Sequence, residues 1–204
     1  MKHSTPVRDR LISVGRALFC ARGFDGVSVR ELTARAKANL GAITYHFGSK
    51  EGLYHAAIES IAGPFAEMLA AAARGPGNAL DRIEAVVRAA LSNASPQPGV
   101  PTLVLRELAN DRPLPPPMAQ LMKRNIGTVL GIIAEGQREG TVRAGDPALL
   151  ALSVVSQPFY FKIAGRGIEQ ALGLSRNDPA VRARVVEHVV KSVRQTIAAR
   201  PQVS

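Results

Sequence analysis

The chain has 204 residues, and its 26 Lys and Arg against 16 Asp and Glu give a formal net charge of +10. Hydrophobic residues make up 46% and charged residues 21%, which excludes a disordered chain and leaves room for one or two globular domains. A single cysteine, Cys20, excludes a disulfide scaffold and a multi-thiolate metal site and fits a reducing compartment. No run approaches about 18 apolar residues and no signal peptide is recognisable, so we expect no membrane span and a cytoplasmic location.

The positive charge is concentrated at the start of the chain. Residues 1–50 hold 9 Lys and Arg against 3 Asp and Glu, a net of +6, whereas residues 51–204 hold 17 against 13, a net of +4. A basic segment followed by a nearly balanced one favours a polyanion-binding head, with an ordinary solvated basic surface as the alternative. We therefore expect two domains, at residues 1–50 and 51–204.

Helical patterns run along the whole chain and strand patterns are almost absent, which predicts an all-α fold. The first helix has Leu11, Val14 and Leu18 on one face and stops near Gly23. Ser28 and Asn39 are the expected caps of the next two helices, and Pro158 is expected to kink or break the eighth. Caps and breakers give about nine helices in all, the other eight at 28–36, 39–47, 50–74, 79–92, 102–109, 118–138, 146–172 and 178–200. A Pro/Gly loop is expected at 95–101.

The helices at 28–36 and 39–47, joined by a short turn and preceded by a longer helix, have the order of a helix-turn-helix. The second would enter a DNA major groove, because a helix about 10–12 Å across fits a groove about 12 Å wide. Small residues allow close approach to base edges, and polar ones can reach bases or phosphate oxygens. The residues expected to contact DNA are Ser28, Lys37, Asn39, Leu40, Gly41, Ala42, Thr44, Tyr45, His46 and Lys50.

The stretch from Gly23 to Leu53, and above all the string Tyr45-His46-Phe47-Gly48-Ser49-Lys50-Glu51-Gly52-Leu53, closely resembles the DNA-binding head of TetR-type transcriptional regulators. The resemblance is strong over about residues 8–55 and rests on helix number and length beyond them. It implies a homodimer, an operator with two half-sites, and a helical pocket whose ligand releases DNA.

The resemblance also assigns roles within the head. Tyr45, His46 and Lys50 map onto positions that contact phosphates, and Leu40, Ala42 and Thr44 onto the side that faces the groove. A small core beneath them is implied for Phe24, Leu32, Ile43 and Phe47. The family usually has glycine in the turn where this chain has Lys37. A left-handed Lys37 would cost on the order of 1 kcal/mol relative to glycine, or the lysine could add a phosphate contact.

The second segment carries a candidate pocket for a small-molecule effector. Flexible apolar side chains and one aromatic beside Pro158 are suited to a flat, largely apolar ligand, and Arg106 could orient it. Arg106 and Glu107 could instead pair with each other at the surface, and plain core is the alternative for every apolar member. The candidate lining residues are Phe65, Met68, Leu69, Val104, Arg106, Met122, Ile126 and Tyr160.

A dimer interface is expected on the last helix and the one before it. The valine stripe of the last helix is too wide for one side of a surface helix, and two helices from each protomer would form a four-helix interface. Burial in the core of the monomer is the alternative. The residues assigned to the interface are Leu152, Val155, Val185, Val186, Val189, Val193 and Ile197.

No residue pattern indicates a catalytic set, a metal site or a cofactor, so we expect none of these. The four histidines show no ligand spacing, and Cys20 has no resolving partner, which favours a small buried side chain over a redox sensor. The sequence therefore favours a DNA-binding transcriptional regulator, a ligand-responsive repressor above all. The alternatives are a ligand-independent architectural DNA-binding protein and, less favoured, a helical enzyme or binding protein.

Overall fold

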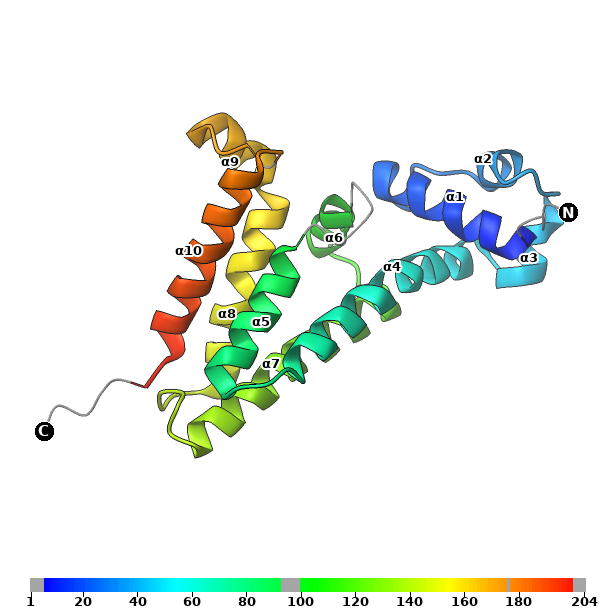
Figure 1. Ribbon diagram of the computed structural model, residues 1–204. Helices are drawn as coiled ribbons and strands as arrows, with labels where there is room; N and C mark the ends of the chain where they lie inside the picture. The colour runs from blue at the N-terminus through cyan, green and yellow to red at the C-terminus, as the bar shows by residue number, and fades with distance from the viewer. Residues whose placement is uncertain (1–5, 93–99, 176, 200–204) are drawn as a thin grey trace, which may run out of the picture. The chain divides into compact units, whose positions relative to one another are not determined.

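The computed structural model describes residues 6–92, 100–175 and 177–199 (Figure 1). Within these ranges the fold is all-α, and its one strand-like contact is an isolated bridge between Val142 and Ala198. The ten helices are α1 (Val7–Arg22), α2 (Val29–Arg35), α3 (Gly41–Phe47), α4 (Lys50–Ala73), α5 (Ala79–Leu91), α6 (Val100–Leu108), α7 (Pro116–Arg138), α8 (Pro147–Ile163), α9 (Gly165–Leu172) and α10 (Pro179–Ile197). The loop expected at 95–101 lies largely outside the described residues, as does residue 200 at the expected end of the last helix.

The eighth helix is not broken at Pro158, one of the two outcomes expected there. α8 continues through Pro158, which is buried, and the chain breaks at Ala164 instead. There α8 and α9 meet at a bend of 72°, so the expected single helix is two. Asp146 and Asp178 do begin their helices as expected, each accepting backbone N–H bonds ahead of a proline at the first helical position.

The described residues fall into two compact units. The first unit comprises residues 6–65 and 100–121, and the second comprises residues 66–92, 122–175 and 177–199. Two long helices, α4 and α7, each begin in the first unit and end in the second. The domain boundary expected at residue 50 therefore differs from the division into two compact units. The expected boundary stays a prediction about where the DNA-binding part ends.

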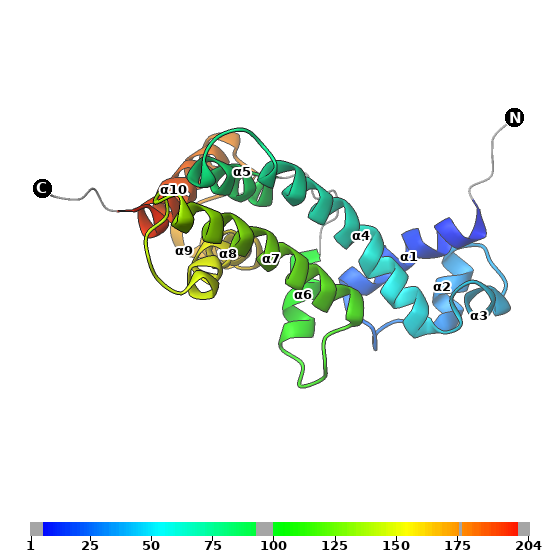
Figure 2. The ribbon, with the colours of Figure 1, turned by 90° about the horizontal axis from the view of Figure 1, so that it is seen from below.

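In the first unit, α1, α2 and α3 pack against one another, and α6 packs against α1 (Figure 2). Their core contains Leu11, Phe19 and Leu32, together with Leu53 and Tyr54 from the first turns of α4. Cys20 belongs to this core with 3% of its surface exposed, and burial raises the pKa of its thiol. The expectation of a small buried side chain at Cys20 is confirmed.

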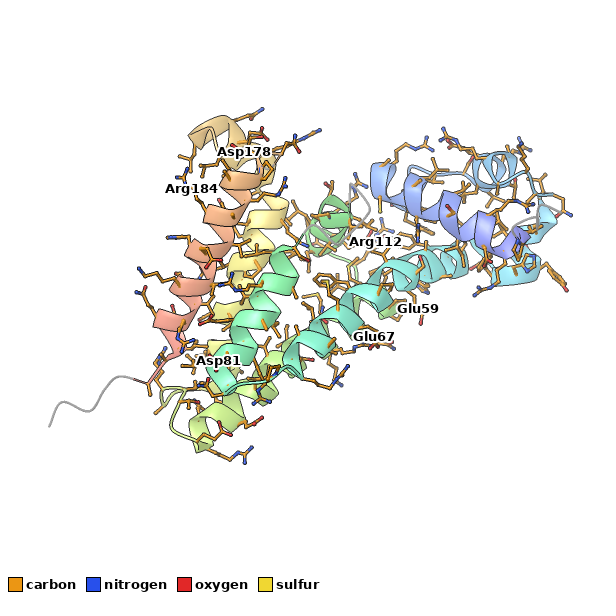
Figure 3. All side chains as sticks on the ribbon, in the orientation of Figure 1. Glu59, Glu67, Asp81, Arg112, Asp178 and Arg184 are labelled. Carbon is orange, nitrogen blue, oxygen red and sulfur yellow. The ribbon has the colours of Figure 1, made fainter. Side chains whose placement is uncertain are left out.

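In the second unit, α5, α8 and α10 lie side by side and pack against one another (Figure 1). Ile83, Val154 and Val189 are among the residues fully buried between them. Ion pairs close the edge between α5 and α10: Arg88 pairs with Glu187, and Arg194 reaches both Glu84 and, at 3.4 Å, the Asp81 labelled in Figure 3. These contacts fix α10 as part of the protomer's own core.

Contrary to the expectation of no membrane span, two segments within the described residues have the length and mean hydropathy of one. They are α4 and, taken together, the bent pair α8 and α9. A third of the most apolar window of α4 is buried inside the structure. Core helices of non-membrane proteins pass the same test of length and composition, and α4 supplies Leu53 and Tyr54 to a core in this way.

Candidate nucleic-acid interface

The helix α2 is fixed at its start by Ser28 and at its flank by two arginines. The Ser28 hydroxyl accepts the backbone N–H of Glu31 at 3.1 Å, as the capping pattern predicts. The Glu31 carboxylate does not complete the box; it binds Arg22 and, at 3.1 Å, Arg35. The hydrogen bond from Arg22 lowers the pKa of Glu31. Ser28 is therefore engaged in capping while its side chain stays exposed at the surface.

The turn from α2 to α3 is built on a left-handed lysine. Lys37 has φ of +50°, and it is the one non-glycine residue with positive φ in the described part of the chain. The N–H of Lys37 bonds to the carbonyl of Ala34 at 3.2 Å, and that of Ala38 to the carbonyl of Thr33 at 2.9 Å. This is the Schellman pattern, in which glycine usually occupies the left-handed position. Of the two possibilities that the sequence left open for this turn, the structure thus has Lys37 in the left-handed region, and the lysine side chain is exposed.

The helix α3, which the sequence predicts to enter the DNA major groove, has one buried and one exposed face. Leu40 begins it without a side-chain hydrogen bond, so the expected cap at Asn39 is wrong; Asn39 contributes only its backbone carbonyl, to the N–H of Ala42 at 3.1 Å. Ala42 is 7% exposed and packs into the core with Ile43, which corrects its assignment to the groove side. Since successive residues of a helix are turned by about 100°, Ala42 points away from the side of α3 that carries Leu40 and Thr44.

The exposed face of α3 consists of the residues that remain available to DNA. They are Asn39, Leu40, Gly41, Thr44 and Tyr45, of which Tyr45 is 83% exposed. A Cβ added to Gly41 would meet no atom closer than 3.8 Å, so nothing inside the chain requires a glycine there. This face is short, has polar residues at both ends, and has Gly41, without a side chain, near its middle. Such a surface can come close to the floor of a DNA groove.

Two predicted phosphate-contacting residues lie at the end of α3 and the start of α4. His46 is half-buried, with its ring edge-on to Tyr45 at 4.8 Å between centroids. The Lys50 ammonium lies 4.2 Å from the centroid of the Phe24 ring, a cation–π contact that holds it at the first turn of α4. Phe24 and Phe47 pack at the edge of the core, and Leu32 and Ile43 lie inside it, as the resemblance implies.

Two neighbouring residues of α6, Arg106 and Glu107, contact residues in or beside α1 and α4. The sequence pattern alone does not indicate these contacts. The Tyr54 hydroxyl donates to Glu107 at 2.6 Å, and the Arg106 guanidinium lies so close to Gly23 that a Cβ there would come within 2.8 Å of Nη1. Glu107 therefore pairs with Tyr54 instead of with Arg106. In Arg106, the atom Nη1 is buried without a hydrogen-bond partner.

Replacing Tyr54 with phenylalanine tests this link by its pH dependence. Burial, and then the hydrogen bond to Glu107, raise the pKa of Tyr54 above its usual value. A raised folded-state pKa stabilises the fold fully below the unfolded pKa of about 10 and progressively less above it, by up to about 1.4 kcal/mol per pH unit. Tyr54→Phe should lose about 1–3 kcal/mol at neutral pH and show a shallower decline above pH about 10. Urea unfolding of both proteins across that range measures this; parallel declines would contradict it.

The residues predicted to line a ligand pocket are divided between the two units. Phe65, Val104 and Arg106 belong to the first unit, and Met68, Leu69, Met122 and Ile126 belong to the second. Tyr160 is 58% exposed, so its assignment to an interior cavity is wrong. An open depression in the second unit, lined by Gln137, Arg143 and Thr196 among others, contains none of the predicted residues.

The predicted dimer residues are also separated by the structure. Val189, Val193 and Ile197 are at most 1% exposed because α10 packs against α5 and α8, so their assignment to an interface is wrong. Val155, Val185 and Val186 are half-buried. Leu152 remains, at 49% exposure.

Leu152 is one member of an apolar stripe along α8. The stripe follows helical spacing and consists of four exposed side chains, Leu149, Leu152, Phe159 and Tyr160, with the exposed polar Ser156 between them. No group of three or more His, Cys, Asp or Glu residues that could hold a metal ion occurs in the described ranges.

The head also carries the similarity to known proteins. Residues 11–57 match the family described as bacterial regulatory proteins, tetR family. The HTH-type transcriptional repressor DhaR of Mycobacterium sp. (strain GP1) is 43% identical over 47 residues, which are 23% of this chain and 24% of DhaR. The match thus spans about a quarter of that curated relative. The residues matched by the family model run from α1 through α2 and α3 into the start of α4.

Solved structures extend the likeness in fold to nearly the whole chain. A TetR transcriptional regulator from Chloroflexus aurantiacus J-10-FL superposes with a TM-score of 0.72 at 20% identity, covering 95% of this chain and 97% of the other. AibR, in complex with isovaleryl coenzyme A and operator DNA, superposes with a TM-score of 0.69 at 17% identity, covering 92% and 97%. Over residues 11–57 the chain is thus similar in sequence to bacterial regulatory proteins of the tetR family, and over nearly its whole length it is similar in fold to a solved TetR regulator.

Proposed function

We propose that the protein is a sequence-specific DNA-binding transcriptional regulator that represses by occupying an operator and releases it when a small molecule binds. The exposed face of α3, framed by a helix-turn-helix in a basic head, is the observation that carries this proposal. The likeness of the head to the repressor DhaR supports the sign of regulation. The proposal assigns the chain no catalytic step and places it in the cytoplasm with the DNA that it binds.

The first test separates base contacts from phosphate contacts. Thr44→Ala should change the preferred base at one operator position, worth roughly 1–3 kcal/mol, because Thr44 lies on the exposed face of α3. Tyr45→Phe should weaken binding to all duplexes about equally, since phosphates carry no sequence information. Selection of duplexes from a random library, repeated with each variant, measures both. An unchanged preferred sequence for Thr44→Ala would contradict the groove-facing assignment.

We further propose a homodimer that places two heads on two operator half-sites. The α8 stripe supports it, because an exposed apolar row beside small residues is suited to a helix–helix interface. Half-sites read by such a dimer lie about 34–36 Å apart, one turn of the DNA helix. A palindromic selected site with that spacing is the expected result.

The ligand arm of the proposal is located in the second unit. Met68, Leu69, Met122 and Ile126 offer partly buried, flexible apolar volume, and AibR binds a coenzyme A thioester. A ligand there would shift α4, which runs from the head into this unit, and so would change the placement of the heads. A panel of coenzyme A thioesters, aromatic acids, phenols and cationic dyes tests operator release. Release by none of them would favour the ligand-independent DNA-binding protein.

A further inference from the structure

The turn between α2 and α3 is held from outside by one side chain of α1, that of Arg10. Its Nε donates to the carbonyl oxygen of Ala36 at 2.9 Å, and its Nη2 donates to that of Lys37 at 3.3 Å. Ala36 is the C-cap residue of α2, and Lys37 is the left-handed residue that begins the turn. A guanidinium presents several donors in a planar fork and can address two neighbouring acceptors, which a lysine ammonium does less well.

The carbonyls of Ala36 and Lys37 do not take part in the backbone hydrogen bonds that close the C-terminal end of α2. The N–H groups of Lys37 and Ala38 reach back to the carbonyls of Ala34 and Thr33, which leaves the next carbonyls along the chain to an outside donor. Ala36 is 2% exposed, so water has little access to its carbonyl, whereas the bond from Arg10 to the Lys37 carbonyl is exposed. A buried carbonyl without a donor is costly, and Arg10 supplies that donor.

The turn that Arg10 holds is also strained. Lys37 stands in the left-handed region, which glycine adopts freely and a lysine does not. Strained backbone persists where the surroundings over-determine it. Only a few residues separate Lys37 from the start of α3, so any relaxation of the turn changes the direction in which α3 points its exposed face.

We propose that Arg10 is a positioning residue for sequence recognition: by binding the carbonyls of Ala36 and Lys37 it keeps the strained turn in the conformation that aims α3. This inference rests on the proposed function. Base contacts require close geometry, whereas phosphate contacts depend mainly on charge. Loss of the clamp therefore lowers the preference for the operator more than it lowers affinity for DNA in general.

The experiment compares two duplexes: one selected by the wild-type protein from a random library, and a scrambled duplex of the same composition. Arg10→Met is expected to reduce the ratio of the two affinities about tenfold. Arg10→Lys keeps the charge without the planar fork and should lose most of the ratio as well. Arg30→Met, at an exposed arginine of α2, removes the same charge and should weaken both duplexes equally, leaving the ratio unchanged.

A second substitution tests whether strain at Lys37 is what Arg10 opposes. Lys37→Gly in the Arg10→Met background should recover most of the ratio, because glycine needs no clamp to stay left-handed. Lys37→Gln removes the same charge, keeps the strain and should recover nothing. Far-UV circular dichroism confirms that each variant is folded. If Arg10→Met does not fold, the same comparison is made between Arg10→Lys and the double variant Arg10→Lys, Lys37→Gly. A higher affinity ratio in the double variant supports the inference, and equal ratios in the two proteins overturn it.

The failures are distinguishable. A wild-type protein that selects no sequence would refute the proposed function. A wild-type protein with a clear preference, together with an Arg10→Met variant that weakens both duplexes equally, would leave the function standing and refute the positioning role.

Discussion

Leu152→Asp is expected to turn a dimer into folded monomers. Leu152 lies in the middle of the exposed apolar stripe of α8, where the substitution places a carboxylate without a partner into the proposed interface of each protomer. An unpaired charge buried in an interface costs about 3 kcal/mol or more. Operator affinity should fall with dimerisation, because two half-sites are no longer engaged by one linked pair of heads. Sedimentation at micromolar concentration, with operator titrations beside it, measures both effects.

Two further variants sharpen that experiment. Leu105→Asp changes a leucine of similar exposure on α6, in the other unit, and should remain dimeric. Val189→Asp changes a residue with no exposed surface and should unfold the protomer instead of separating two protomers. A Leu152→Asp protein that stays fully dimeric and keeps wild-type operator affinity would remove the α8 stripe from the interface.

Gly41→Leu is expected to weaken operator binding by roughly 2 kcal/mol or more while making the protein slightly more stable. The position is exposed at the first turn of α3, and a side chain there meets open space within the chain. Leucine favours a helix over glycine by up to about 1 kcal/mol, so the fold gains. The same side chain would stand between α3 and the groove floor, so DNA binding loses.

Gly127→Leu is the matched control for this substitution. Gly127 lies on α7, is exposed, and an added Cβ there meets nothing within 4 Å, whereas at Gly41 it meets one Asn39 side-chain atom, at 3.8 Å. Both variants should gain stability in urea unfolding, and only Gly41→Leu should lose affinity for the selected duplex. Equal affinities in the two variants would mean that α3 does not approach DNA through Gly41.

Local patterns in the sequence predicted the helices and the head well. Capping by Ser28, Asp146 and Asp178 and the burial of Cys20 all depend on residues within a few positions of one another or on side-chain size. Such features are determined by residues that are close together in the sequence, so they can be predicted from a single sequence.

The errors concern which neighbour covers an apolar surface. The valines of α10 form a wide stripe because α5 and α8 both pack on it, and the stripe alone cannot tell an intramolecular partner from a second copy of the chain. Ala42 is small, which suggested groove contact, but its direction on α3 depends on where the helix begins. The contacts of Tyr54 with Glu107 and of Arg10 with Ala36 join residues 53 and 26 positions apart, and no local spacing indicates them.

The packing of α4 and α6 makes the first unit, which carries the proposed DNA-binding face, discontinuous along the chain. Its core takes Leu53 and Tyr54 from beyond residue 50, and Leu103 and Met118 from a separate segment. A fragment ending at residue 50 would expose the apolar surface of Leu11 and Phe19 that these residues cover. Grafting the proposed operator specificity onto a regulator therefore requires more than exchanging N-termini. The recipient must supply a compatible α4 and α6, or only the exposed residues of α3 can be transferred.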